Sequence, residues 1–273
     1  MKRINQVITT LLLVLVMTHS AFAQLSVSPK RVIFENRERS HELLLINTGD
    51  KTKKYRIHFK QLKMTTHGGY EDITEQEAGQ YLYASDAVRF SPRQVTLKPG
   101  MTQTIRLLVR KPKGLADGEY RSHLTFSEIP DDSEDFGTPQ AEQTEGMAFE
   151  MRPLLGMSIP IILRQGKLTQ SVEIKNIQVD ASEVNVELHR VGQASVYGQM
   201  DVMFKPANGS SLLEVGKIKG VSVLTPLDWR TVVIPLNTDI SQLGAGSLEL
   251  IYHNLEENSA QDLPVLTKTT IDI

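Results

Sequence analysis

Side chains that could perform catalysis occur in this sequence, but their spacing matches no familiar catalytic arrangement. The seven histidines are dispersed, without the His-x-x-His or His-Glu-x-x-His spacing of a zinc site. The chain has no cysteine, no Gly-x-Ser-x-Gly turn and no glycine-rich phosphate loop. Acidic pairs such as Glu75 and Glu77 are typical of solvated faces. The sequence therefore predicts a protein that is not an enzyme, with no catalytic residues, no metal site and no cofactor.

The chemistry that remains is backbone pairing, and one long segment is patterned for it. From residue 147 to residue 163 every odd position is apolar: Met147, Phe149, Met151, Pro153, Leu155, Met157, Ile159, Ile161 and Leu163. A period of two is typical of a β-strand. At roughly 3.3 Å per residue such a strand would be about 55 Å long, and one domain cannot cover that length. Part of the apolar row is therefore expected to lack a partner within the chain.

Two prolines locate this segment at the edge of a sheet. Pro153 and Pro160 have no N–H to donate to a neighbouring strand, which confines them to an edge or to irregular ends. A long apolar edge strand favours aggregation unless the protein uses it for pairing with another chain by strand addition. We expect Ile159 and Ile161 to point into such a partner. The alternative is a broken element, with a strand at 147–151, a bend at Pro153 and a second strand at 155–163.

The elements around this segment are also predicted to be strands. Apolar and polar residues alternate at 55–60, 104–110 and 120–127, and again at 184–188 and 248–252, with turn sequences such as Pro99-Gly100 and Asn208-Gly209 between strands. Many short strands at this spacing predict an all-β fold of two immunoglobulin-like β-sandwich domains in tandem, at 24–164 and 167–273. One short helix is expected, from Ile73 to Ser85.

The first 23 residues are predicted to be a cleaved signal peptide. Lys2 and Arg3 precede an apolar run from Ile8 to Met17, and Ala21-Phe22-Ala23 has the small-x-small pattern of a cleavage site. No later stretch approaches the roughly 18 apolar residues of a membrane span, so the mature protein is not expected to be embedded in a membrane. A net charge near −2 argues against nucleic acid as a partner. Without cysteine, each domain must be held by burial and backbone pairing alone.

Several short motifs resemble those of the PapD-like periplasmic chaperones of the chaperone–usher pathway. The similarity spans most of residues 25–164, and its order and spacing are more specific than any single piece. The matching pieces are Ser28-Pro29-Lys30-Arg31-Val32-Ile33-Phe34, Leu45-Ile46-Asn47-Thr48, Phe90-Ser91-Pro92, Leu97-Lys98-Pro99-Gly100 with Gln103 and Arg106, and Glu128-Ile129-Pro130. Residues 167–273 resemble the family only in forming a second β-sandwich.

This resemblance implies a function in pilus biogenesis. Members of the family bind fimbrial subunits that lack a final strand, and they complete each subunit with a strand of their own first domain before delivery to an outer-membrane usher. It implies a periplasmic protein whose donor strand contains Leu155, Met157, Ile159, Ile161 and Leu163. Met147, Phe149 and Met151 would add the extended contacts of the long-loop branch of the family.

The resemblance also assigns an anchor and a domain linkage. Arg31 falls on the family's arginine that binds the subunit's terminal carboxylate, whereas the family's second cation, a lysine, falls on Pro160. The two-cation anchor is therefore incomplete in this sequence. Glu128 and Arg164 match two members of an interdomain ion pair, and the third member is Glu256 or Glu257.

Other classes of protein fit the sequence less well. A pilus subunit or surface adhesin with immunoglobulin-like domains is the main alternative, but such subunits need a strand from a partner, whereas this chain has a surplus strand. A small-molecule or glycan-binding sandwich would need aromatic residues clustered on loops, and only 6% of the residues are aromatic.

Export provides the first test of these predictions. We expect the mature protein to begin at Gln24 and to be recovered in soluble form outside the cytoplasm. N-terminal sequencing of the purified protein measures this directly, and soluble protein that retains Met1 would contradict it.

Overall fold

The computed structural model describes residues 25–35, 37–130, 156–209, 211–256 and 263–273. The predicted signal peptide lies outside these residues, as do Leu155, Met147, Phe149 and Met151. In the described part of the chain, no helix has the length and apolarity needed to cross a membrane.

The first group of strands forms two sheets that pack face to face. One sheet has the order β1-β3-β9-β7 and the other has the order β2-β11-β10-β4-β8. The strands of the first sheet are β1 (Leu25–Ser28), β3 (Ser40–Asn47), β9 (Thr102–Val109) and β7 (Val88–Ser91). Those of the second are β2 (Val32–Phe34), β11 (Gly156–Gln165), β10 (Gly118–Ile129), β4 (Lys53–Lys60) and β8 (Gln94–Leu97). These orders correspond to the ABED and GFC sheets of an immunoglobulin-like sandwich.

The second group repeats this plan. One sheet has the order β12-β13-β16 and the other the order β15-β14-β17-β18. Their strands are β12 (Val172–Val179), β13 (Glu183–Arg190), β16 (Trp229–Pro235), β15 (Leu213–Val223), β14 (Val196–Pro206), β17 (Gly246–Asn254) and β18 (Val265–Asp272). The prediction of an all-β chain with two immunoglobulin-like sandwiches is confirmed by this topology.

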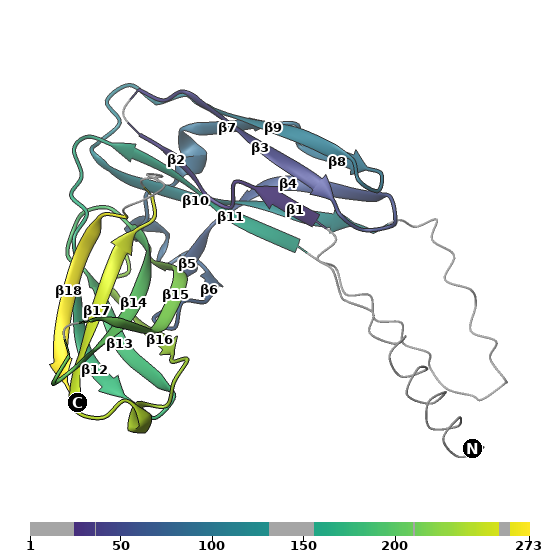
Figure 1. The fold of residues 1–273 in the computed structure, drawn as a ribbon. Helices are drawn as coiled ribbons and strands as arrows, with labels where there is room; N and C mark the ends of the chain where they lie inside the picture. Colours follow the sequence, from purple (N-terminus) through teal and green to yellow (C-terminus); the bar gives the residue numbers. More distant parts are fainter. Residues whose placement is uncertain (1–24, 36, 131–155, 210, 257–262) are drawn as a thin grey trace, which may run out of the picture.

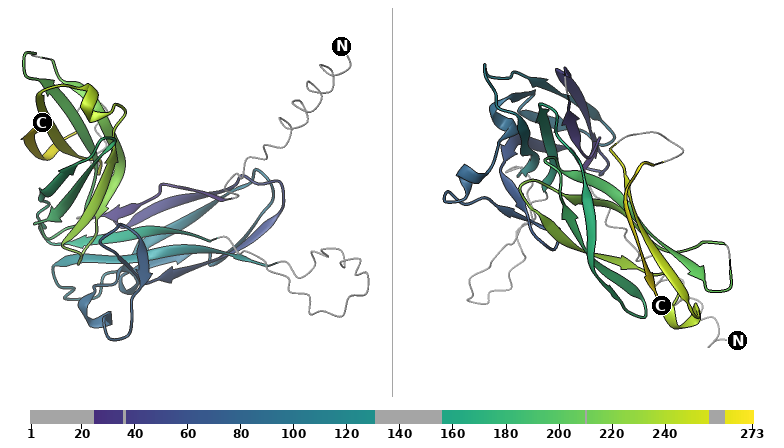
Figure 2. Two further views of the ribbon diagram at one scale, coloured as in Figure 1. Left: turned by 90° about the horizontal axis from the view of Figure 1, so that it is seen from below. Right: turned by 90° about the vertical axis from the view of Figure 1, so that its left-hand side faces the viewer.

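The two sandwiches meet at one end of the first and form an elbow (Figures 1 and 2). β11 ends at Gln165 and β12 begins at Val172, so the chain passes from one group of sheets to the other in this interval. A small two-stranded hairpin, β5 (Leu62–Met64) and β6 (Tyr70–Asp72), leaves the first sandwich and occupies the inner angle of the elbow (Figure 1).

The predicted alternation decides which side chains form each core. Tyr55 and Ile57 of β4 and Ile105 and Leu107 of β9 are buried in the first core, while the residues between them on the strands are more exposed. Val184, Val186 and Leu188 of β13 enter a separate second core. Each sandwich therefore has a hydrophobic core of its own, as a chain without disulfides requires.

The helix expected from Ile73 to Ser85 is wrong. This stretch contains two short 3-10 turns, η1 (Ala78–Gln80) and η2 (Ala84–Asp86), and the described residues include no α-helix. A third 3-10 turn, η3 (Ile240–Gln242), lies in the second sandwich. The apolar residues between 73 and 85 are too few for a continuous stripe, and only Ala84 is buried in either turn of this stretch.

The expectation that Ile159 and Ile161 point into a partner is also wrong. β11 pairs with β10 over its whole length, which places Ile159 opposite Leu124 and Leu163 opposite Tyr120. Residues opposite each other share a side of the sheet, so the odd row of β11 faces the first core. Ile159, Ile161 and Leu163 are each no more than 2% exposed, and Met157 packs against the same cluster.

Substitution of the odd row should therefore unfold the protein. Ile159→Glu would bury a charge without a partner, at a cost of several kcal/mol, comparable with the whole stability of a domain. Thermal melting followed by circular dichroism should show loss of the first domain's transition. The matched control is Ser158→Glu, on the exposed face of the same strand, which should melt close to wild type. An Ile159→Glu protein that melts normally would remove this side chain from the core.

Candidate functional site

The outer edge of β11 is only partly paired within the described residues. On one side β11 pairs with β10 from Gly156 to Gln165, but on the other side β2 covers only Ile161 to Leu163, in parallel. The stretch from Gly156 to Pro160 therefore presents its second edge without a partner strand in the described part of the chain. The prediction that Pro160 lies at an edge agrees with this pairing.

This open edge has no charged side chain to protect it, and its one blunting residue is Pro160, where the open stretch ends. Natural edges are blunted by charged side chains or prolines, by bulges or by a covering element. The five residues are Gly156, Met157, Ser158, Ile159 and Pro160, of which none is charged. In the sequence the apolar odd positions continue ahead of Gly156, through Leu155 and beyond.

Arg31 lies where the open edge ends. Because Val32 pairs with Ile161 in parallel, the residue before Val32 lies next to Pro160. Its guanidinium donates from Nη1 to Oε1 of Glu256 at 3.2 Å and from Nη2 to Oγ of Ser222 at 3.1 Å. The Arg31 Cζ atom also lies 4.2 Å from the centre of the Tyr197 ring, a cation–π contact. The predicted anchor residue is thus at the elbow and is paired with residues of the second sandwich.

Arg164, at the other end of β11, is the centre of a buried ion-pair network. Its Nε donates to Glu119 at 3.0 Å, and its Nη1 donates to Glu256 at 2.9 Å and to Glu35 at 2.7 Å. The side chains of Arg164 and Glu256 are 8% and 6% exposed, and that of Glu119 is fully buried. Burial alone lowers the pKa of Arg164, but the hydrogen bond and charge of Glu256 and the charge of Glu119 outweigh burial and raise this pKa above its usual value.

Both carboxylates of this network accept further hydrogen bonds besides those from Arg164. Glu119 accepts from the N–H and the Oγ of Ser195 and from Oγ1 of Thr225. Glu256 also accepts from Nε2 of Gln170 at 2.6 Å. A buried carboxylate needs this many donors to stay charged. Together, Arg164, Glu119 and Glu256 form what we call the elbow network.

In the observed elbow network, one predicted member of the interdomain ion pair is replaced by a different acid, and the acid from the second sandwich is identified. Arg164 is in the predicted interdomain ion pair, and its acid from the second sandwich is Glu256. Glu128, however, is the wrong acid, because it pairs with Lys53 at 2.6 Å at the far end of β10. Glu119, nine residues earlier on the same strand, is the acid that contacts Arg164. In the sequence, the one indication of this contact is that Glu119 lies two residues before Arg121, so that both side chains point to the outward face of β10.

The β5–β6 hairpin makes a second connection across the elbow. The N–H of Thr231, in β16, donates to the carbonyl of Thr66 at the hairpin turn, at 2.8 Å. Next to it the guanidinium of Arg230 lies so close to Gly68 that an added Cβ would be 2.0 Å from Nη2. Arg121 of β10 bridges the two sides, donating to the carbonyl of Leu62 at 2.8 Å and of Thr225 at 3.0 Å.

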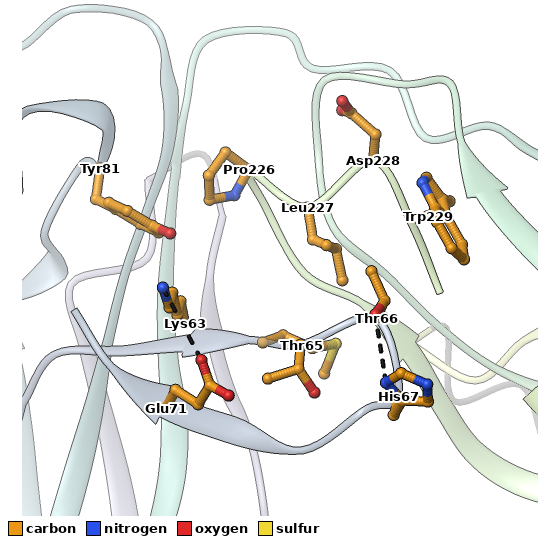
Figure 3. A pocket seen from close by; sticks show the side chains of 11 residues that line it. Lys63, Thr65, Thr66, His67, Glu71, Tyr81, Pro226, Leu227, Asp228 and Trp229 are labelled. Carbon is orange, nitrogen blue, oxygen red and sulfur yellow. Dashed lines mark hydrogen bonds and ion pairs between the residues drawn. The ribbon is translucent and has the colours of Figure 1, made fainter. Parts of the chain in front are cut away.

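A cavity of about 550 Å³ lies between this hairpin and the second sandwich (Figure 3). Lys63, Thr66 and Glu71 line it from the hairpin, and Pro226 and Trp229 line it from the other side. The charge of Lys63 is already satisfied, because its ammonium pairs with Glu77 at 2.5 Å and lies 3.9 Å from Glu71. Among the described residues there is no group of three or more metal-ligating side chains.

Comparison with known proteins gives weak similarities. No protein-family model matches the sequence, and no curated protein matches it. The Pseudomonas aeruginosa CupB2 chaperone has a similar structure, with a TM-score of 0.43 and 15% identity over 90% of this chain and 98% of that chain. The class 5 fimbriae chaperone CfaA has a TM-score of 0.43 and 14% identity, over 91% of this chain and 98% of its own.

A complex has a comparable similarity. In the pre-assembly complex of CsuC with the tip adhesion subunit CsuE, from the archaic chaperone–usher Csu pili of Acinetobacter baumannii, the matched chain has a TM-score of 0.43 and 15% identity. The match covers 92% of this chain and 98% of that one. Because identities and TM-scores are this low, a function for this chain has to come from its own residues.

Removing Arg164 tests the elbow network. Arg164→Met should destabilise the protein by about 3–5 kcal/mol, because it leaves Glu119 and Glu256 buried without their shared cation. The angle between the sandwiches should also become variable, which small-angle scattering measures as a larger radius of gyration. Glu128→Gln is the control: it removes an ion pair outside the elbow and should leave the scattering curve unchanged. Equal scattering from both variants and wild type would show that the network does not set the angle.

Proposed function

We propose that this protein is a periplasmic chaperone that binds pilus subunits by lending them the open edge of β11, and that delivers them to an outer-membrane usher. The observation that supports the proposal most directly is the edge from Gly156 to Pro160, which lacks both a partner strand in the described residues and any charge. Strand addition to such an edge gives sequence-tolerant affinity through backbone hydrogen bonds. The motifs shared with PapD-like chaperones agree with this function.

The donor segment we propose is shifted from the one that the alternation alone predicted. Ile159, Ile161 and Leu163 fill the protein's own first core, so they are not available to a partner. Apolar contacts with a subunit are instead assigned to the odd positions ahead of Gly156, namely Leu155, Met151, Phe149 and Met147. These residues lie outside the described residues, and Met157, half-buried at the start of β11, marks the transition between the two sets.

Arg31 is assigned the terminal carboxylate of the subunit. A strand lying along the open edge would run into the beginning of β2, next to which Arg31 lies. An incoming carboxylate would replace Glu256 at this guanidinium, and Glu256 would keep its bonds to Arg164 and Gln170. The exchange leaves no buried charge unpaired, which keeps its cost low. No lysine is needed at Pro160 for this single-arginine arrangement.

Capture of subunits tests the proposal. The full-length protein should be co-expressed in the periplasm with each pilus subunit encoded by the same genome, and purified to ask which subunits are recovered as one-to-one complexes. Arg31→Ala and Leu155→Glu should each lose recovery, by at least about tenfold, since one removes the anchor and the other puts a charge into an apolar groove. Both variants should fold, because Glu256 retains other donors and Leu155 precedes the core-facing part of β11.

Two controls keep this test decisive. Lys205→Glu, at an exposed position of the second sandwich, should recover subunits nearly as well as wild type. Failure of the wild-type protein to recover any subunit would refute the proposed function. Normal recovery by Arg31→Ala would refute only the assignment of the anchor.

A further inference from the structure

The outward side of the β2-β11-β10-β4-β8 sheet has an unusual charge pattern. The outward positions of β4 are Lys54, Arg56, His58 and Lys60, and the neighbouring outward positions of β10 include Arg121 and His123. We call these six residues the basic face. Lys54, Arg56 and Lys60 are exposed, whereas Arg121 and His123 are buried near the elbow.

Apart from the members of the elbow network, no Asp or Glu occupies an outward strand position of this sheet in the described residues. The outward positions of β8, of β11 up to Ile162 and of β10 from Arg121 onward contain no Asp or Glu. Alternate residues of one strand are about 6.8 Å apart, so the cations of β4 repel one another. Lys60 alone pairs with an acid, Asp72 of β6, at 2.8 Å, whereas Lys54 and Arg56 form no ion pair with the described residues. For a chain with a net charge of −2, this segregation is pronounced.

Three buried polar atoms without a hydrogen-bond partner in the described residues lie on this face, on His58, Arg121 and His123, whereas a fourth, on Gln61, lies on the core side next to Ser85. In the described residues four buried side-chain atoms lack a hydrogen-bond partner, and they belong to residues on or next to β4 and β10: His58 Nδ1, Gln61 Oε1, Arg121 Nε and His123 Nε2. Arg121 is 6% exposed and His123 is 1% exposed.

At least two of these atoms are hydrogen-bond donors. The Nε–H of Arg121 can only donate. Nδ1 of His123 lies 3.4 Å from Nη1 of Arg121 and accepts from it, which assigns the ring proton to Nε2. Burial, reinforced by the charges of Arg121 and Arg31, lowers the pKa of His123 to about 3, so the ring is neutral at pH 7. Both donors are inaccessible to solvent, so the groups of this face that an incoming acceptor can reach are the exposed cations Lys54, Arg56 and Lys60.

We infer that the basic face is a docking surface for an acidic, extended polypeptide segment of the same partner that pairs with the open edge of β11. The inference rests on the proposed function. Face and edge are continuous, because β10 lies between β4 and β11 and Oγ1 of Thr125 lies 3.0 Å from Oγ of Ser158 across the two strands. A subunit on the edge would therefore overhang the basic face.

The shape of the molecule selects a polypeptide over a membrane. Arg121 reaches both the hairpin and the second sandwich, so the basic face turns toward the inner angle of the elbow (Figure 1). Tyr70 of the hairpin, 46% exposed, packs edge-on against His123 with ring centres 4.9 Å apart and bounds the face there. A flat bilayer would meet the second sandwich before reaching β4, whereas an extended segment fits within the angle.

The first arm of the test uses a defined probe. A ten-residue peptide of alternating Asp and Thr, with blocked ends, is titrated into the isotope-labelled mature protein, and an Asn–Thr peptide of the same length is the neutral control. The Asp–Thr peptide should shift the amide signals of β4 and β10, and its binding should weaken as salt rises from about 50 to 500 mM. Lys54→Glu/Arg56→Glu should weaken it by at least about tenfold. No shift in these strands, or equal shifts with the Asn–Thr peptide, would overturn the inference.

Matched controls and a second arm separate the possible outcomes. Lys175→Glu/Lys205→Glu makes the same charge change at exposed positions of the second sandwich and should bind the peptide like wild type.

Recovery of pilus subunits should fall in the Lys54→Glu/Arg56→Glu variant only. Unchanged recovery there would overturn the docking role and leave the proposed function standing. If wild type recovers no subunit, the proposed function fails and the peptide arm alone decides the docking surface. Stronger binding to phosphatidylglycerol vesicles than to the peptide would contradict a polypeptide occupant.

Discussion

The buried guanidinium of Arg164 is the interaction on which the geometry of this molecule depends. It lies near the end of β11, shortly before the second sandwich, and its ligands come from β10, from the segment after β2 and from the residues after β17. A charge buried this far from solvent is stable only when all of its hydrogen-bond acceptors are present. The two sandwiches supply these acceptors to each other at the elbow. We expect the network to fix the direction of β11 relative to the second sandwich.

β11 combines two functions that a strand seldom has together. From Ile161 to Leu163 it is covered on both edges, by β2 and β10, and its odd side chains complete the first core. Its front half keeps one edge open. The core contacts supply the free energy that holds the strand in place, so the open edge does not have to be stabilised by a partner before it is used. This division explains how the free protein can remain folded while exposing unpaired backbone groups.

The sequence predicted the strands well because each depends on a local pattern. Alternation at 55–60, 104–110 and 120–127 matched β4, β9 and β10, and the two-sandwich topology followed from the number and spacing of such segments. The features it missed depend on distant contacts. Parity shows that residues 159 and 161 share a face with each other, but only the pairing with β10 shows that this face is the core. Likewise, Glu119 and Glu128 both lie on β10, and which of them meets Arg164 is decided by which end of that strand abuts the second sandwich.

Near its C-terminal end β11 is buried on both faces, and this constrains the orientation of the chain ahead of Gly156. Ile162 and Leu163 are neighbours that point to opposite faces, and both are essentially inaccessible to solvent. A shift of one residue would exchange these environments and place Arg164 on the core side, so the strand cannot slide in register. The pairing near the C-terminal end of β11 therefore decides which of its residues face the core and which face outward. Any strand that continues ahead of Gly156 inherits that orientation, and during evolution a single-residue insertion there would invert its apolar row, whereas a two-residue insertion would preserve it.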